Sequence, residues 1–242
     1  MELKKISKSI WITTPEEERD RPVLGYIKGN KFSVCIDAGN SREHLMEFYN
    51  LLKENQLELP KFTVMTHWHW DHTYGMHAVN GYTIAEKNTN KLVKKMMAWK
   101  WTDKHMKQRL KEGEVSELSD RCIRKEYMNL NDIVVKAADI VFSNSMTINL
   151  GDISCEVFET KSLHCEDSVM IYIPEEKIIF IGDADAGNQI QLTSEERQSR
   201  IKAMIKVLSE KDIDIVVIGH DRPQSIKEEI DYLQEKLNEI IE

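Results

Sequence analysis

Residues 67–72 read His-Trp-His-Trp-Asp-His, so three of the eight histidines in the chain fall within six positions. His67 and His69 follow a short apolar segment that we expect to be a strand. Because alternate side chains of an extended backbone point to the same side, both imidazoles can reach one metal ion. Asp71 and His72 can serve a second ion nearby, since neutral imidazole and carboxylate are ligands that zinc takes in catalytic sites. The run therefore predicts a chain that folds around a metal centre.

Three further residues of ligand type follow β-rich or apolar segments, and each is expected in a loop. His164 lies between two predicted strands, Asp183 ends the sequence Ile-Gly-Asp, and His220 ends the sequence Ile-Gly-His. Loops at strand ends are where sites are normally assembled on a rigid scaffold. These positions argue against the simpler interpretation of residues 67–72, a group of surface histidines beside two tryptophans.

Apolar periodicity predicts an alternation of strands and helices. Helices are expected over Ser41–Glu54, within about 86–129, around 201–208 and over 226–240. Strands are expected at Ser9–Thr13, Val23–Ile27, Phe32–Ile36, Lys61–Thr66, Ile133–Val135, Thr147–Leu150, Ile153–Phe158, Val169–Ile173, Ile178–Ile181 and Ile213–Ile218. Two sheets packed face to face, with helices outside, would bury both sheets. We therefore expect one α/β domain over 1–242 with a helical insertion at about 86–129.

Composition excludes several classes of protein. No apolar run approaches the roughly 20 residues that a membrane-spanning helix needs, and the first residues lack the pattern of a signal peptide. Four scattered cysteines fit reduced thiols better than a disulfide framework, so a cytoplasmic location is expected. The net charge of −8 makes nucleic acid an unlikely partner.

The order and spacing of these motifs closely resemble the metallo-β-lactamase superfamily. The matching features are the run at 67–72, His164 followed by Asp167-Ser168, the pair Gly182-Asp183, and the pair Gly219-His220. The resemblance extends from Asp37 to the last helix and implies an αββα sandwich with metals at one edge of the two sheets. It implies one metal held by His67, His69 and His164, a second held by Asp71, His72 and His220, and Asp183 as a bridge between them.

The chemistry implied is hydrolysis by a metal-bridged hydroxide. Two divalent metals roughly 3.5–4 Å apart lower the pKa of a shared water, and the hydroxide attacks a carbonyl carbon or a phosphorus. Asp71 is expected to orient the nucleophile and to carry its proton onward. Zinc is the first expectation, and iron or manganese also suit a site of histidines and carboxylates.

Departures from known branches of the family narrow the expected substrate. The best-known zinc β-lactamases have Cys where Asp183 stands, and the oxygen-reducing di-iron branch has Glu in place of the second His of the run, here His69. We therefore expect cleavage of an ester, thioester or lactone bond in a small molecule. The alternatives are a phosphodiesterase acting on a small phosphate ester and a non-enzymatic metal-binding module.

The insertion carries an unusual concentration of positive charge. Residues 87–111 hold nine basic side chains and one acidic side chain, a balance of +8 against −16 for the remainder. The segment could be a basic lid that favours an anionic substrate, a solvated helix face, or a contact with a second copy in a dimer. Apolar residues alternate with the basic ones and are expected to pack or to line a substrate pocket: Met96, Met97, Trp99, Trp101 and Met106.

A few remaining residues have smaller expected roles. His44, His77 and His105 match no motif position and are expected to be structural or solvent-facing. Trp68 and Trp70 are expected to pack or to form a pocket wall. Cys165 is expected to be a buried thiol, and two neighbours of ligands could support them or contact substrate: Asp185 and Arg222.

Overall fold

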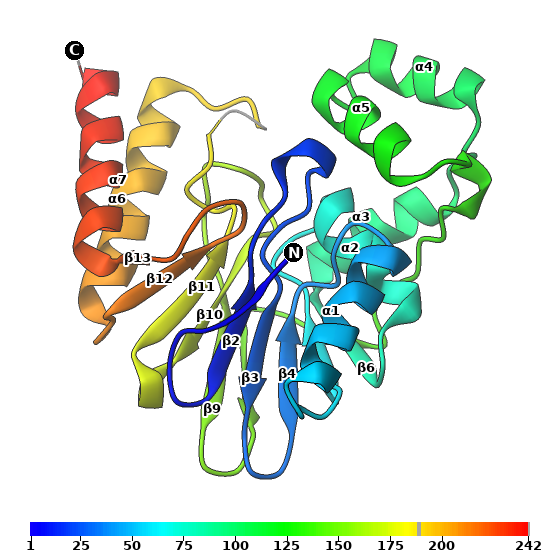
Figure 1. Ribbon diagram of the computed structural model, residues 1–242. Coiled ribbons are helices and arrows are strands. Elements are labelled where there is room, and N and C mark those ends of the chain that lie inside the picture. The colour runs from blue at the N-terminus through cyan, green and yellow to red at the C-terminus, as the bar shows by residue number, and fades with distance from the viewer. Residues whose placement is uncertain (188–189, 242) are drawn as a thin grey trace.

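The computed structural model describes residues 1–187 and 190–241. The first of its two sheets follows the order of the chain (Figure 1). Its strands are β1 (Leu3–Lys5), β2 (Ile10–Thr13), β3 (Gly25–Lys28), β4 (Ser33–Ile36), β5 (Phe62–Val64), β6 (Tyr82–Glu86) and β7 (Ile140–Phe142). Neighbouring strands are antiparallel from β1 to β4 and parallel from β4 to β7.

The second sheet is built from the later part of the chain, in the order β13-β12-β11-β10-β9-β8. Its strands are β8 (Ser145–Asn149), β9 (Ser154–Glu159), β10 (Val169–Ile173), β11 (Ile178–Gly182), β12 (Ile215–Ile218) and β13 (Gln224–Ser225). All neighbours are antiparallel except β11 and β12, which are parallel because the chain crosses over through a helix between them.

The two sheets pack face to face around one apolar core. Side chains alternate across each strand, so Ile171 and Ile173 point into this core while Met170 and Tyr172 point to the outer face. The strands of the second sheet that are buried on both faces therefore appear in the sequence as continuous apolar runs, as in β10 and β11.

Helices cover both outer faces (Figure 1). Helix α1 (Arg42–Glu54) packs on the first sheet through residues that include Leu45 and Phe48. Helices α6 (Ser194–Glu210) and α7 (Ile226–Ile241) cover the second sheet through residues that include Met204 and Leu233. The layers are thus helix, sheet, sheet, helix, which is the αββα sandwich predicted from the sequence.

The remaining helices lie at one end of the sandwich. They are α2 (Trp70–Thr73), α3 (Lys87–Met97), α4 (Asp103–Glu112) and α5 (Glu117–Glu126), with the short 3-10 helices η1 (Glu17–Arg19), η2 (Tyr74–Ala78) and η3 (Leu130–Asp132). A further 3-10 helix, η4 (Pro174–Glu176), forms the turn between β10 and β11 at the other end of the sandwich. The helical character of about 86–129 is confirmed, as three helices between β6 and β7. Their apolar residues form a cluster of their own with Trp70 and Tyr74.

Two expectations differ from the structure. The strand at Ile133–Val135 is wrong, because Ile133 ends η3 and its side chain is buried in the cluster of the insertion and not in a sheet. Strands β1, β6, β7 and β13 were not predicted: β1 and β7 have three residues each and β13 has two, and β6 directly precedes the helical segment. Within 1–187 and 190–241, no helix combines the length and the apolar character needed to cross a bilayer.

Candidate metal centre

The seven predicted ligands converge at one end of the sandwich, although they come from five parts of the chain. The segment after β5 carries His67 and His69, and it leads into α2, whose single turn presents Asp71 and His72. The other three follow strands of the second sheet: His164 lies in the loop between β9 and β10, Asp183 directly after β11, and His220 shortly after β12. Each sheet thus contributes residues to the site.

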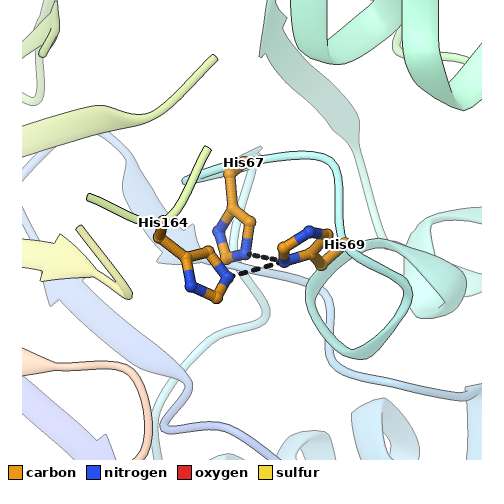
Figure 2. A group of neighbouring side chains, drawn as sticks. All are labelled: His67, His69 and His164. Carbon is orange, nitrogen blue, oxygen red and sulfur yellow. Dashed lines mark hydrogen bonds between the residues drawn. The ribbon is translucent and has the colours of Figure 1, made fainter. Parts of the chain in front are cut away.

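His67, His69 and His164 form the first group (Figure 2). His69 Nδ1 lies 3.0 Å from His67 Nε2 and 2.7 Å from His164 Nε2. Each side chain thereby turns one ring nitrogen toward a common point, which is the arrangement that a three-histidine zinc site requires.

Asp71, His72, Asp183 and His220 form the second group. Asp71 Oδ2 lies 3.1 Å from His72 Nε2 and 3.0 Å from His220 Nε2. The Asp183 carboxylate lies between the groups: its Oδ1 is 3.5 Å from His72 Nε2, and its Oδ2 is 3.5 Å from His164 Nε2. Asp183 is therefore the side chain that reaches both groups.

Two glycines make room for this arrangement. A Cβ on Gly219 would lie 2.0 Å from Asp183 Oδ1, so any larger residue would displace that carboxylate. Gly182 has a φ of +54°, and a Cβ there would lie 2.8 Å from the Thr66 side chain. The Gly-Asp and Gly-His pairs in the sequence are thus explained by close packing at the site.

The residues fit a divalent metal. His72 Nε2 and Asp183 Oδ1 are buried without a hydrogen-bond partner among the described residues, which is costly unless an ion satisfies them. In the first group, one ring nitrogen from each of the three histidines also lies close to the others. A neutral imidazole has one N–H donor and one acceptor nitrogen, so these three nitrogens cannot all be satisfied by hydrogen bonds among themselves. Buried histidine and carboxylate atoms that face one another in this way suit zinc, iron or manganese.

In the first group, burial keeps the imidazoles neutral and ready to bind. Burial lowers the pKa of His67 well below its ordinary value, and His72 lowers it further. Burial and the neighbouring His164 lower the pKa of His69 to about 3. Burial also lowers the pKa of His164. All three side chains can therefore offer a lone pair at neutral pH without first losing a proton.

The second group behaves differently because it contains carboxylates. Burial acts against protonation of His220, but Asp183 and Asp71 outweigh it and raise the pKa to about 9. The same two carboxylates hold the pKa of His72 well above its ordinary value despite burial. Burial opposes ionisation of Asp71 and Asp183, but the nearby His72 and His220 keep both pKa values low. Without metal, this group is a buried cluster of ion pairs.

Asp37 and Thr66 support the ligands and were not predicted as site residues. Asp37 Oδ2 lies 2.8 Å from His72 Nδ1 and accepts the Thr66 hydroxyl hydrogen at 2.8 Å, while Oδ1 accepts the Thr66 N–H at 2.7 Å. Since a carboxylate accepts, His72 Nδ1 donates, and Thr66 Oγ1 is left to accept from His67 Nδ1 at 3.0 Å. Both histidines are thereby held with the Nε2 lone pair facing the site. The position of Asp37 at a predicted strand end was the only signal available.

A cavity of about 550 Å³ opens over both groups. On the site side it is lined by Trp68, Trp70, Asp71 and Asp183, and Asp20 lies beside His220. The insertion supplies much of the opposite wall, through parts of α3, α4 and α5 and the turn between α4 and α5. The insertion thus lies over the site, but its lysines do not line the cavity, so its charge does not form the basic lid that was one of the three alternatives.

The other residues singled out in the sequence fall into clear roles. His44 is fully buried in α1, and His77 and His105 lie away from the two groups. Trp68 and Trp70 form part of the cavity wall, as do Met96 and Trp99. Trp101 and Met106 pack inside the insertion, and Met97 is exposed.

Burial raises the pKa of Cys165 well above its ordinary value, so its thiol is inert. Asp185 is buried two residues after Asp183, and Arg222 is exposed and pairs with Glu228 at 3.0 Å.

Comparison with known proteins agrees with this geometry. The model of the metallo-beta-lactamase superfamily matches residues 23–220, and the chain belongs to that superfamily. Most of its members are metal-dependent hydrolases that bind divalent metals, typically zinc. No curated protein matches the sequence significantly.

Solved structures share the fold at low sequence identity. A metallo-beta-lactamase from Pontibacter korlensis aligns with a TM-score of 0.69 and 21% identity, over 99% of this chain and 98% of the other. The DIM-1 metallo-beta-lactamase aligns with a TM-score of 0.65 and 20% identity, over 99% and 97%. The sec-alkylsulfatase Pisa1 from Pseudomonas sp. aligns with a TM-score of 0.70 and 12% identity, over 99% of this chain and 41% of the sulfatase.

Proposed function

We propose that the protein is a dinuclear metal-dependent hydrolase that cleaves an ester, thioester or lactone bond in a small molecule. His67, His69 and His164 would hold one ion, and Asp71, His72 and His220 the other, with Asp183 shared between them. The observation that carries the proposal is the Asp183 carboxylate, which lies within 3.5 Å of a ring nitrogen in each group. Zinc is the proposed metal, because the donors are imidazole nitrogens and carboxylate oxygens.

The chain positions the reacting groups beneath the cavity. When bound, the two ions would lower the pKa of a water and polarise the carbonyl of the substrate. Asp71 lines the cavity and stays ionised, so its carboxylate can accept a hydrogen bond from the attacking water and hold it in line with the carbonyl carbon. The aromatic wall formed by Trp68 and Trp70 limits access of bulk water to this point.

The test pairs metal analysis with a substrate panel. Protein purified and saturated with zinc is expected to contain about two equivalents by elemental analysis. It should hydrolyse at least one of a carboxylic ester, a thioester and a lactone. Turnover of bis-nitrophenyl phosphate alone would instead favour the phosphodiesterase alternative, and two bound ions without any turnover would favour a metal-binding module.

An Asp183→Ala variant separates the roles within the site. It should keep the fold, because the sheets supply the core, but should bind about one equivalent of zinc and lose hydrolysis by about a hundredfold or more. Asp139→Ala is the control, since Asp139 is a carboxylate at the far edge of the first sheet and belongs to neither group. Two tightly bound ions and normal turnover in Asp183→Ala would show that Asp183 is not shared.

A further inference from the structure

Part of the wall that the insertion contributes to the cavity is apolar, beside polar residues that include Ser116 and Ser119. Trp99 faces the cavity from the segment between α3 and α4, Leu110 from α4, Val115 from the turn before α5, and Ile123 from α5. Trp68, Trp70 and Tyr74 line the side next to the ligands. Aromatic and aliphatic side chains on two sides of a cavity bind hydrocarbon by removing it from water.

The basic side chains of the insertion do not face the cavity. Its nine lysines are exposed, and none of them lines the cavity. Arg109 is buried behind the wall, with its guanidinium carbon 4.6 Å from the Trp99 ring centre and 4.8 Å from that of Trp101. Its Nη2 donates to the Lys100 carbonyl at 3.2 Å. The charge of Arg109 is therefore used to brace two tryptophans.

The charged side chains that do reach the cavity, apart from the ligand groups, are acidic. Asp20, Glu114 and Glu117 line it, and Glu114 is paired with Lys95 at 2.8 Å whereas Glu117 is exposed at the mouth. No lysine or arginine belongs to the described lining. An anionic group in the substrate would therefore meet carboxylates and find no cationic partner in this wall.

We infer that the substrate is an uncharged ester, thioester or lactone whose acyl part is a hydrocarbon chain or ring packed against the wall formed by Trp99, Leu110 and Ile123. The inference rests on the proposed function, whose substrate class it narrows. In the reaction the acyl C–O or C–S bond breaks, the oxygen of water joins the carbonyl carbon, and the leaving alcohol or thiol takes up a proton. A cavity of about 550 Å³ is large enough for a medium-length acyl chain with its leaving group.

The first experiment compares acyl thioesters that share one uncharged leaving group, with the zinc-loaded protein. From acetyl to octanoyl, kcat/KM should rise by about fourfold for each methylene buried. An octanoyl chain ending in a sulfonate, a weak metal ligand, should react at least about tenfold more slowly than the uncharged chain. Equal rates for these two substrates, or no gain with chain length, would overturn the inference.

A charge change at the mouth gives a second test that does not disturb the core. Glu117→Lys should reduce the preference for the uncharged chain by about threefold or more, and raised salt should weaken the effect. Glu112→Lys is the matched control, because Glu112 is exposed on α4 and does not line the cavity. An identical change in preference for both variants would show that long-range charge, and not the cavity, sets the preference.

A binding measurement separates this inference from the proposed function. Octanamide should quench or shift the fluorescence of the zinc-loaded protein, because three tryptophans line the cavity, and 8-sulfo-octanamide should bind at least about tenfold more weakly. Preferential binding of octanamide without hydrolysis of any thioester would uphold the cavity assignment and contradict the proposed function. Hydrolysis of a thioester with equal binding of both amides would uphold the proposed function and contradict the cavity assignment.

Discussion

Asp37 shows how a residue that binds no metal can decide whether a metal site works. Its backbone has a φ of +62°, in a region that few residues other than glycine, asparagine and aspartate adopt easily. This conformation aims the carboxylate at Thr66 and at His72 Nδ1. The orientation of His72 thus depends on a left-handed backbone position directly after β4.

Asp37→Asn is therefore expected to lower zinc affinity by about 10-fold to 100-fold while the fold is kept, since asparagine tolerates the same backbone conformation. The loss arises because a neutral amide holds the His72 tautomer less firmly and no longer increases the basicity of its Nε2. Competition with a fluorescent zinc chelator measures the affinity.

Asp139→Asn provides the control for this prediction. Asp139 Oδ2 accepts from the Thr83 N–H at 3.0 Å and from the Thr83 hydroxyl at 2.8 Å, and it contacts no histidine. This arrangement reproduces the Asp37–Thr66 pair without the metal centre. Unchanged zinc affinity in Asp37→Asn, or an equal loss in both variants, would contradict a specific role for Asp37.

The candidate metal ligands could be predicted from the sequence more readily than the residues that orient these ligands through hydrogen bonds. His67, His69, Asp71, His72 and the three later positions stand out because they are rare residue types at strand ends. Asp37 and Thr66 do not stand out, because one aspartate and one threonine after strands are ordinary. Their role depends on a hydrogen-bond geometry that only the folded chain defines.

At the scale of elements, the insertion is fastened to the sandwich by a buried ion pair. Arg21, in the segment after η1, donates from Nε to Glu126 Oε2 at 3.0 Å and from Nη2 to Glu126 Oε1 at 2.8 Å. The Arg21 and Glu126 side chains are 5% and 1% exposed, and Ser41 also donates to Glu126. The pair joins the N-terminal segment, α1 and the end of α5, which carries one wall of the cavity.

Breaking this pair should cost stability and loosen the wall. Glu126→Gln removes the most buried carboxylate that pairs with Arg21 and leaves Glu47, at 2.9 Å, as its remaining close partner. The free energy of unfolding should therefore fall by about 2 kcal/mol in chemical denaturation, because charge-assisted hydrogen bonds are lost. KM for substrates with long acyl chains should rise, because α5 presents Ile123 to the cavity.

Lys125→Gln is the control, since it breaks the exposed Lys125–Glu18 pair between the same two elements. An exposed pair of this kind contributes at most about 1 kcal/mol. A loss for Glu126→Gln no larger than that for Lys125→Gln would show that the buried pair does not fasten the insertion.

Composition revealed that the insertion is helical but not which way its charges face. Lysines and apolar residues alternate through α3 and α4, and the sequence alone allows either set to face the site. In the structure the apolar set forms the internal cluster and part of the cavity wall, while the lysines face outward. The misplaced strand at Ile133–Val135 has the same cause, since an apolar triplet can enter a helical cluster as readily as a sheet.

For the whole molecule, the candidate metal centre lies where the two sheets meet. His67, His69, Asp71 and His72 depend on the first sheet, and His164, Asp183 and His220 depend on the second. Ions bound there would link the sheets, so binding energy would add to the stability of the fold. We therefore propose that residues 1–242 form one domain whose halves unfold together, and that this cooperativity increases when metal is bound.

Removal of metal should change the way in which stability depends on pH. In the metal-free protein the pKa of His220 is about 9, against an ordinary value of 6.5, because Asp183 and Asp71 outweigh the effect of burial. A folded-state pKa above the unfolded value contributes stability that is fully present below pH 6.5 and is lost as pH rises through 9. His72 acts in the same direction. Protein treated with a chelator should therefore have a melting temperature that falls between pH 6.5 and 9.

The zinc-dependent increase in melting temperature should show the opposite trend. Zinc must displace the protons of His72 and His220, so protons compete with it less as pH rises and the increase grows toward pH 9. Thermal unfolding with chelator and with zinc, across this range, measures both trends. His220→Asn should flatten the metal-free profile, whereas His77→Asn, a histidine outside the two groups, should leave it unchanged. Competition from protons can only lower the affinity for zinc as pH falls. An increase in melting temperature with zinc that is larger at pH 6.5 than at pH 9 would therefore contradict the view that zinc displaces protons from these histidines.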